Sequence, residues 1–595
     1  MGQAEYNHGG DLVAGVLRNA GVSTIFTLCG GHISPILAGC KHQGIEVVDA
    51  RHEASAVFAA DAMARMTGIP GVAAVTAGPG VTNAITALKN AQMAQSPLIL
   101  LGGASATVLR GRGSLQDIDQ LSIVRSCVKW AVSVDKVHDI ESVMDQALSV
   151  AKSGVPGPVF VELPIDLLYP EKFVREWYGL KGGDQGKGIT KKAIGWYLNR
   201  HLTHLFESAG DGLKRQVEQT RQYFFQASRE QWQQEIAKPL LSMAVKQFNR
   251  ARKPVMVVGS QAVCEPAQVP VLVHALNKLG VPVYLSGMAR GVLGEEHPLQ
   301  MRHQRKMALK DADLVILAGV PCDFRLDYGS HISRKAALIS VNRHAGDLLR
   351  NRIPTVPVHG DPAGFLNALA LCPKSTSPDS GWLASLRERD TARNQEILEQ
   401  SQRAAAEGGV NPLALFLALD ELLPANSVLV ADGGDFVATA AYTLRPKRQL
   451  SWLDPGVYGT LGVGGGFALG ARYSRPDAEV WVIWGDGSSA YSLSEIDTFV
   501  RHGKGMVALI GNDAKWNQIA RDQVELLGDD VGVMLRQSDY HKVAQGYGGE
   551  GLLLAKQEDI VPVLEKAQRL ARKGKAVVVN VLLAASDFRK GSISV

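Results

Sequence analysis

Two acidic residues near the C-terminus have the surroundings of a metal and phosphate site. Asp486 follows the apolar run 480–484, and Asp513 stands shortly after the apolar run 506–510. Both runs are typical of buried parallel strands, and open parallel sheets bind ligands at the carboxyl ends of their strands. The residues beside Asp486 are small and would let phosphate oxygens approach the backbone: Gly485, Gly487, Ser488 and Ser489. The pattern predicts a hard cation such as Mg²⁺ between carboxylates and phosphate.

A second group of candidates lies in the N-terminal third, at turns that follow apolar strands. Glu53 opens a helix after the strand 47–50, where the helix N-terminus alone would stabilise an acid. The same position would also suit an acid buried against a cofactor. The turn 76–83 is rich in glycine, and His32 closes the turn Gly30-Gly31-His32. Taken one at a time, these residues also fit ordinary structural roles.

The elements that position these residues alternate between strand and helix. Short apolar strands, helical patterns and glycine turns recur in three blocks, which predicts an α/β protein with three consecutive doubly wound parallel-sheet domains. We place these domains at 1–171, 246–375 and 411–595, and the first and third look like one architecture used twice. A helical insertion or linker is expected at 172–245, and a polar connector at 376–410.

The composition fits a large globular enzyme. The chain has 595 residues, of which 46% are hydrophobic and 20% are charged. The net charge of +5 is spread too evenly to indicate nucleic-acid binding. Six cysteines lie far apart without a CxxC pair, which is typical of reduced thiols in an intracellular protein. We find no N-terminal apolar segment long enough for a signal peptide or a membrane span, so we expect a cytoplasmic protein.

The order of the motifs resembles that of the thiamine diphosphate-dependent enzymes. The motifs are Gly-Gly-His at 30–32, Arg-His-Glu at 51–53, Thr-Ala-Gly-Pro-Gly-x-Thr-Asn at 76–83, and Gly-Asp-Gly at 485–487 with Asn-Asp at 512–513. The resemblance is to the branch of acetolactate synthase, benzaldehyde lyase and 2-hydroxyacyl-CoA lyase, and it covers nearly all of the chain except 172–245. It implies pyrimidine-binding, central Rossmann-like and diphosphate-binding domains, with thiamine diphosphate and Mg²⁺. Because some members hold FAD or ADP in the central domain, either remains open here.

The resemblance also implies roles for single residues. Glu53 would hydrogen-bond the aminopyrimidine ring and favour the imino tautomer, which takes part in general acid–base chemistry. Asp486, Asp513 and the backbone carbonyl of Lys515 would bind the metal ion, although most relatives have Asn at the position of Asp513. Leu461 would be the apolar wedge that bends the cofactor. The other implied cofactor contacts are Thr76, Gly78, Asn83, Gly459, Gly485, Gly487, Ser488, Ser489 and Trp516.

The reaction is inferred from a smaller set of residues. His32 and Gln116 resemble the active-site histidine and glutamine of benzaldehyde lyase, so we expect them to handle protons. Ile519 stands where simple 2-keto acid decarboxylases have a glutamate, and Asp522 stands near the place of a tryptophan in acetolactate synthases. The stretch 288–298 resembles 2-hydroxyacyl-CoA lyases and oxalyl-CoA decarboxylases.

These likenesses favour cleavage of a 2-hydroxyacyl-CoA to formyl-CoA and an aldehyde, with the reverse condensation. The alternatives are decarboxylation of a 2-keto acid with acyl transfer, as in acetolactate synthase, and acyloin cleavage, as in benzaldehyde lyase. A non-catalytic regulatory relative is disfavoured because Glu53, Asp486 and His32 are all present.

The resemblance implies a homodimer or homotetramer whose active sites are shared between subunits. The expected substrates are an acyl-CoA ester and an aldehyde, or a 2-keto acid. Arg589 and Lys590 in the C-terminal tail either meet CoA phosphates or belong to a frayed end. Related lyases carry an N-terminal membrane anchor without a counterpart here, so we expect a soluble homologue.

The insertion contains one predicted amphipathic helix. Its apolar positions share a helical face: Ile194, Tyr197, Leu198, Leu202, Leu205 and Phe206. Such a face fits packing on the protein's own surface or on a partner subunit better than it fits a membrane surface.

Overall fold

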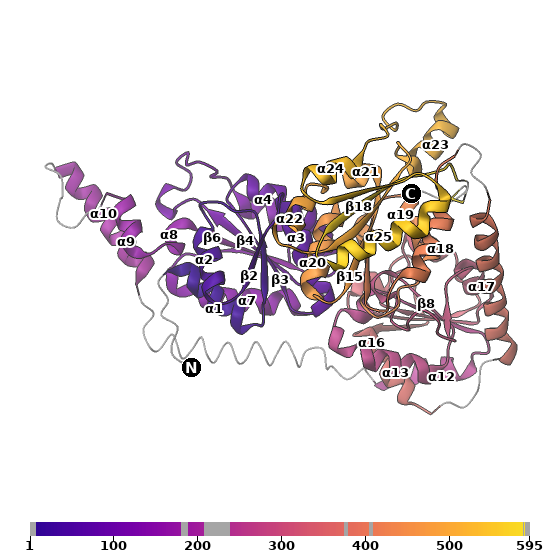
Figure 1. The fold of residues 1–595 in the computed structure, drawn as a ribbon. Helices are drawn as coiled ribbons and strands as arrows, with labels where there is room; N and C mark the ends of the chain where they lie inside the picture. The colour runs from indigo at the N-terminus through magenta and orange to yellow at the C-terminus, as the bar shows by residue number, and fades with distance from the viewer. Residues whose placement is uncertain are drawn as a thin grey trace. The chain divides into compact units, whose positions relative to one another are not determined.

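The computed structural model describes residues 8–179, 189–207, 238–373, 379–403, 408–586 and 588–589. It contains three sheets of six strands, and every pairing between neighbouring strands in them is parallel (Figure 1). The predicted α/β class with three parallel-sheet domains in sequence is therefore confirmed. The chain divides into two compact units, Met1–Gln231 and Trp232–Val595, and each is described by itself.

The first unit holds one sheet in the order β2-β1-β3-β4-β6-β5. Its strands are β1 Thr24–Thr27, β2 Glu46–Asp49, β3 Gly71–Val75, β4 Leu98–Ala104, β5 Trp130–Ser133 and β6 Pro158–Pro164. The described α-helices are α1 Gly9–Asn19, α2 Ser34–His42, α3 Glu53–Thr67, α4 Pro79–Asn83, α5 Ile85–Met93, α6 Gln120–Val124, α7 Ile140–Lys152, α8 Ile165–Leu168, α9 Glu171–Trp177 and α10 Ile189–Phe206. The core strands β3, β4 and β6 are buried along their whole length, as strands covered on both faces must be.

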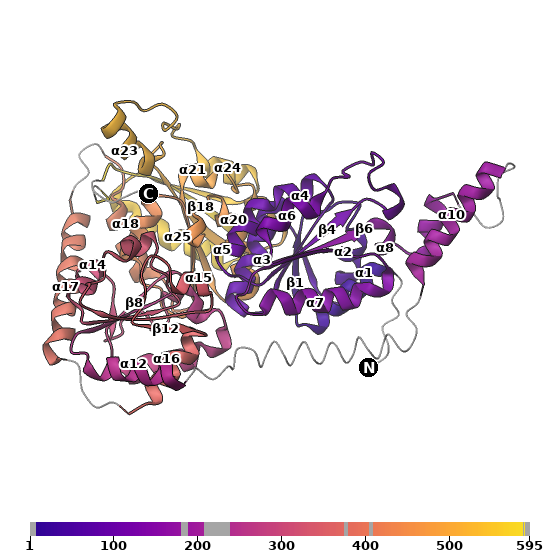
Figure 2. The same cartoon turned by 180° about the vertical axis from the view of Figure 1, so that it is seen from behind.

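The insertion helix α10 divides its apolar face between two environments. Leu202 and Leu205 are buried and belong to the hydrophobic core of the first unit. Ile194 and Tyr197 are exposed, at 54% and 50% of their surface. Figures 1 and 2 show α9 and α10 at one end of this unit, with α10 pointing away from the sheet. The C-terminal half of the predicted face therefore packs on the protein's own surface.

The second unit begins with the central sheet, in the order β12-β11-β10-β7-β8-β9. Its strands are β7 Pro254–Val258, β8 Val283–Leu285, β9 Gln300–Met301, β10 Leu314–Ala318, β11 Ala337–Asn342 and β12 Val356–His359. Its helices are α12 Lys238–Arg250, α13 Val269–Leu279, α14 Arg305–Asp311, α15 Ala345–Leu348 and α16 Pro362–Leu371. The helix α12 runs across the limit that the sequence predicted between 245 and 246, and α17 Ser380–Ser401 occupies the predicted connector.

The third sheet has the order β14-β13-β15-β16-β18-β17. Its strands are β13 Ser427–Asp432, β14 Trp452–Leu453, β15 Glu479–Gly485, β16 Met506–Asn512, β17 Glu550–Leu554 and β18 Ala576–Leu582. Its helices are α18 Pro412–Leu422, α19 Asp435–Thr443, α20 Val463–Ser474, α21 Asp486–Ser489, α22 Glu495–Arg501, α23 Asn517–Leu527, α24 Tyr540–Gly546 and α25 Ile560–Arg572. Counted from its first strand, this order repeats that of the first sheet, as the sequence predicted.

Two arginines of the central domain cap a helix of the third. Arg290 donates to the carbonyl of Ala441 at 2.9 Å, and Arg302 donates to the carbonyls of Tyr442 and Leu444 at 2.8 and 3.1 Å. These carbonyls end α19, where the helix dipole favours a cation. The caps hold α19 in place, and the other end of this helix begins at Asp435, near the predicted metal ligands.

None of the helices in the described ranges combines the length and the apolar character that crossing a membrane requires.

Candidate functional site

The structure brings Asp486 and Asp513 together at the carboxyl edge of the third sheet. They follow β15 and β16, which are neighbours with Gly485 paired to Gly511. Asp486 is 3% exposed, and its two oxygens accept the backbone N–H groups of Gly487 at 2.8 Å and Ala514 at 2.9 Å. Ala514 reaches this position with a left-handed φ of 57°, which is rare for a residue with a side chain.

The electrostatics of this pair favour a bound cation. Burial raises the pKa of Asp486 to about 6. Burial, followed by the charge of Asp486, raises the pKa of Asp513 to about 7, and the Lys515 ammonium opposes this rise. Two carboxylates that are both costly to ionise would be stabilised by a divalent ion between them. Because oxygen ligands suit a hard cation, the residues present fit Mg²⁺.

The turn around Asp486 is closely packed and leaves no room for larger residues. A Cβ added to Gly487 would lie 2.5 Å from the ring of Trp516. The hydroxyl of Ser488 donates to the carbonyl of Asp432 at 2.7 Å, and that of Ser489 donates to the carbonyl of Asp486 at 2.8 Å. These hydroxyl protons therefore brace the turn, so a diphosphate would be bound by backbone N–H groups of the turn.

A buried acid that the sequence did not single out holds the loop of Leu461. Asp432 ends β13 with no exposed surface and accepts the N–H groups of Gly462 at 3.1 Å, Gly464 at 2.7 Å and the Trp484 ring at 2.9 Å. Leu461 is half-buried, and this loop turns through left-handed conformations at Gly459 and Gly462. Burial raises the pKa of Asp432 to about 6. Its signal in the sequence is an acid directly after an apolar run, as for Asp486.

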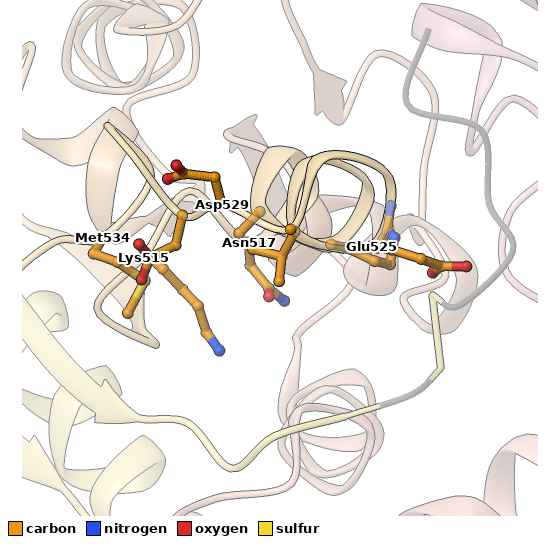
Figure 3. Close-up of a pocket in the computed structure, with 10 residues that line it drawn as sticks. Lys515, Asn517, Glu525, Asp529 and Met534 are labelled. Carbon is orange, nitrogen blue, oxygen red and sulfur yellow. The ribbon is translucent and has the colours of Figure 1, made fainter.

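An open pocket of about 830 Å³ lies along α23, beside the carboxylate pair. Lys515 and Met534 form one side, and α23 carries Asn517 and Glu525 on the other (Figure 3). Lys515 lines this pocket. Its positive charge and its backbone also interact with the Asp513 carboxylate, and both interactions lower the pKa of that group. The pocket therefore opens directly next to the predicted metal ligands.

In the first unit, Glu53 and Asn83 meet at the edge of the sheet. Glu53 is the first residue of α3, and its neighbour His52 caps the helix by accepting the N–H of Ala54 at 3.0 Å. Glu53 is only 6% exposed, and its Oε2 accepts the amide N–H of Asn83 at 3.0 Å. Within the part of the chain that the structure describes, the buried acid thus receives one hydrogen bond, from a neutral partner, and its other oxygen is left for a ligand.

His32 and Thr76 form a second contact at this edge. The ring Nδ1 of His32 lies 3.1 Å from the hydroxyl of Thr76. Gly30 makes this approach possible, because a Cβ there would lie 2.4 Å from the Thr76 side chain. Burial lowers the pKa of His32, so the imidazole is neutral at neutral pH and can accept a proton.

Gln116 and His32 are connected through Gln120, which the sequence reasoning did not assign a role. Gln120 is buried; its Oε1 accepts the N–H of Gly78 at 2.8 Å, and its Nε2 donates to the carbonyl of Gly103 at 3.1 Å. A Cβ on Gly78 would lie 2.9 Å from that of Gln116, and one on Gly103 would lie 2.4 Å from that of His32. The same amide donates to Glu162 at 2.8 Å. Gln120 therefore fixes both predicted proton-handling residues indirectly.

The described part of the C-terminal tail lies against α19. The Arg589 guanidinium is 5.2 Å from the ring centre of Tyr442, and Phe588 meets the same ring edge-on at 5.9 Å. Burial raises the pKa of Asp435, and the charges of Arg521 and then Arg589 oppose this rise. Lys590 lies outside the described residues.

The central domain has its own ligand-binding edge, between β7 and β10, and side chains fill it. Gln261 donates to Asn342 at 3.1 Å and accepts the N–H of Arg343 at 2.7 Å. A Cβ on Gly319 would lie 2.8 Å from that of Gln261, so this side chain lies directly over the end of β10. Arg343 is 4% exposed and paired with Asp361 at 2.6 Å. In the structure, Gln261 and Arg343 therefore occupy the edge at which such sheets bind nucleotides.

Comparison with known proteins covers the same three regions. Models of the thiamine pyrophosphate enzyme match residues 7–123 as the N-terminal TPP binding domain, 241–369 as the central domain and 432–581 as the C-terminal TPP binding domain. The chain is 49% identical to 2-hydroxyacyl-CoA lyase 2 of Danio rerio, over 99% of this chain and 93% of that protein. It is 49% identical to 2-hydroxyacyl-CoA lyase 2 of Homo sapiens, over 100% and 93%. It is 32% identical to the acetolactate synthase large subunit IlvG of Mycobacterium tuberculosis, over 97% and 96%.

Proposed function

We propose a function for this chain from one premise: it belongs to the thiamine pyrophosphate enzyme family. Its two TPP binding domains imply a thiamine diphosphate cofactor. The proposed reaction is the cleavage of a 2-hydroxyacyl-CoA to formyl-CoA and an aldehyde, together with the reverse condensation. The observation that carries this choice is the 49% identity, over almost the whole chain, to proteins named 2-hydroxyacyl-CoA lyase 2.

The chain's own residues divide the work of holding the cofactor. Asp486, Asp513 and the carbonyl of Lys515 would hold Mg²⁺. The backbone at 485–489 would meet the diphosphate, with Trp516 packed behind Gly487 and Leu461 supporting the bend of the cofactor. When bound, thiamine diphosphate supplies a nucleophilic carbon and an electron sink for the carbon–carbon bond.

Proton handling falls to the residues of the first unit. Glu53 would hold a proton between its free oxygen and the cofactor ring, with Asn83 fixing the other oxygen. When Nδ1 of His32 donates to Thr76, Nε2 is left as a proton acceptor for the 2-hydroxyl of the substrate. As the carbon–carbon bond breaks, that hydroxyl becomes the aldehyde carbonyl, and a proton is delivered to the carbon that becomes formyl. Gln116 would orient the reacting carbonyl.

The proposal is tested by supplying the competing substrates side by side. Purified protein with Mg²⁺ and thiamine diphosphate is incubated with a 2-hydroxyacyl-CoA or with pyruvate, and formyl-CoA, aldehyde and acetolactate are measured. We expect formyl-CoA and aldehyde in equal amounts. Acetolactate formation without turnover of the CoA ester would instead support the second candidate, acetolactate synthase chemistry, which the 32% identity to IlvG favours.

We also propose that the working enzyme is a homodimer or a homotetramer with shared active sites. The support is that Glu53 and Asp486 belong to different compact units of the chain. If each site takes its Glu53 from one subunit and its Asp486 from another, two inactive variants should restore each other when they are expressed together. Light scattering after size-exclusion chromatography measures the number of subunits.

A further inference from the structure

We propose that the N-terminal domain binds a transition-metal ion of the zinc type, held by His8, Asp11 and His42. The three residues lie on two helices that pack together: His8 caps the start of α1, Asp11 is in its first turn, and His42 ends α2. One ligand atom from each lies within 4.8 Å of the others, and within the described ranges this is the group of metal-binding side chains that comes together in this way. The site is separate from the predicted Mg²⁺ ligands, which belong to the other unit.

The carboxylate of Asp11 is the centre of this cluster, which we name the α1–α2 cluster. It is 5% exposed; its Oδ2 lies 3.5 Å from Nδ1 of His8, and its Oδ1 lies 3.5 Å from Nδ1 of His42. The His8 ring is 12% exposed, whereas the His42 ring is 63% exposed. The cluster is thus anchored inside the domain and opens to solvent on one side, where an ion could enter.

His8 and Asp11 form a reciprocal contact in which each side chain accepts the backbone N–H of the other residue. Nδ1 of His8 accepts the backbone N–H of Asp11 at 3.2 Å, so its lone pair points toward Asp11. The Oδ2 atom of Asp11 accepts the backbone N–H of His8 at 3.2 Å, which completes a capping box. Nδ1 of His8 and Oδ2 of Asp11 lie 3.5 Å apart. A cation between them would be bound by both.

The geometry and the donor types select the class of metal. With bonds of about 2.1 Å, two ligands of a tetrahedral zinc ion stand about 3.4 Å apart, close to both contacts of Asp11. Two imidazoles and one carboxylate suit Zn²⁺, Co²⁺ or Ni²⁺, whereas Mg²⁺ prefers oxygen ligands. Coordination at Nδ1 of His8 would not leave the Asp11 N–H without a partner, because that group also lies 3.0 Å from the His8 carbonyl.

The ion would join two helices that are already in backbone contact. A Cβ on Gly39 of α2 would lie 2.6 Å from the carbonyl of Gly10 in α1, so α1 and α2 pack at a distance that only glycine permits. The opposite end of α2 begins at Ser34, directly after the turn that carries His32. The metal would therefore stabilise the helix that follows the predicted proton-handling histidine.

The test uses the full chain without an affinity tag, saturated with Mg²⁺ and thiamine diphosphate so that the other metal site is filled. Zn²⁺ binding is measured by titration calorimetry, and Co²⁺ binding is measured by its visible absorption. We expect one ion per chain, with affinity reduced about tenfold or more in both H42A and D11N. Asn at position 11 can still accept the His8 N–H in the capping box, so D11N tests the charge and not the fold. We also expect Zn²⁺ to raise Tm in the wild type and not in H42A.

The matched control is H204A, which removes another exposed histidine that lies 3.8 Å from a carboxylate in the same unit. H204A should bind Zn²⁺ like the wild type. Absence of saturable Zn²⁺ binding in the wild type, or equal binding in the wild type and H42A, would overturn the proposal. Neither result depends on the reaction that the enzyme catalyses.

Discussion

The first and third sheets share one strand order, but the functional side chains at the carboxyl ends of their strands differ. In the first sheet, Glu53 and His32 are held by hydrogen bonds with neutral side chains, and burial lowers the pKa of the histidine. In the third sheet, Asp486 and Asp513 are buried carboxyls whose pKa values are raised. The comparison teaches that topology decides where a site forms, whereas the residues after each strand decide which ligand it suits. The residues of one edge suit proton transfer, and those of the other suit a cation and phosphate.

The most direct test of this difference is to inactivate the two edges in separate variants. We expect E53Q and D486N each to lower kcat/KM by a factor of about a hundred to ten thousand, because one loses the acid–base group and the other a metal ligand. Only D486N should weaken binding of Mg²⁺, measured by calorimetry. When the two variants are expressed together and sites are shared in a symmetric dimer, about a quarter of the wild-type activity should return. Activity of E53Q near the wild-type level would contradict the proposed mechanism, and E46Q, an exposed position in the same domain, serves as control.

Variants of Gln120 and Gln116 test how the residues at the first edge are positioned. We expect the Gln120 variant to change both stability and kcat, and the Gln116 variant to change mainly kcat. Q120A leaves the N–H of Gly78 and the carboxylate of Glu162 without this partner inside the domain, so we expect a loss of about 1–3 kcal/mol in the free energy of unfolding as well as lower kcat. Q116A should lower kcat with little change in stability, since this side chain is half-exposed. Chemical denaturation and steady-state kinetics separate the two. Equal stability of the two variants would show that Gln120 does not position the turn.

A variant of Asp513 tests the electrostatics of the third edge, because most relatives have an uncharged Asn at this position. We expect D513N to weaken Mg²⁺ binding several-fold, since one of two negative charges is removed, while kcat at saturating Mg²⁺ stays within about tenfold of wild type. In metal-free protein the same change should raise Tm, because it removes the repulsion between Asp513 and Asp486. The control is D539N, an exposed acid on the same domain. A metal-free D513N that is less stable than the wild type would contradict the electrostatic account.

His32 should give the first edge an acid limb in its pH profile. Its folded pKa lies below the ordinary value of 6.5, so kcat/KM should stay high through pH 6.5 and fall only at lower pH, as the ring gains a proton. The same shift affects stability, because the unfolded chain takes up this proton near pH 6.5 and the folded chain takes it up only at a lower pH. Acidification below pH 6.5 therefore favours unfolding at this residue. H32Q should lack the acid limb, and an unchanged limb in H32Q would assign it to another group.

The fold could be predicted because its strands are apolar runs, and the candidate site residues could be named because they follow such runs. The strands before Glu53, Asp486 and Asp513 have strong signals, and the resemblance assigned their roles. Asp432 was missed because β13 was not recognised as a strand, and Gln120 because its role depends on two turns that are distant in sequence. The serines illustrate a physical limit: the sequence predicted that Ser488 and Ser489 hold a diphosphate, yet their hydroxyl protons go to backbone carbonyls. Local sequence gives the residue type at a turn, but not the direction of its hydroxyl.

For the central sheet, we expect added FAD or ADP to have no effect. It is doubly wound like the other two, but its strand order differs and its edge is closed by the contacts of Gln261 and Arg343. We therefore expect FAD and ADP to leave Tm unchanged and the purified protein to be colourless, whereas thiamine diphosphate with Mg²⁺ should raise Tm. A stoichiometric flavin would mean that Gln261 moves aside, and Q261A should then bind it more tightly. If the purified protein contains no flavin, the same rule holds for all three sheets. The edge of a sheet then forms a binding site only where its side chains leave polar atoms for a ligand.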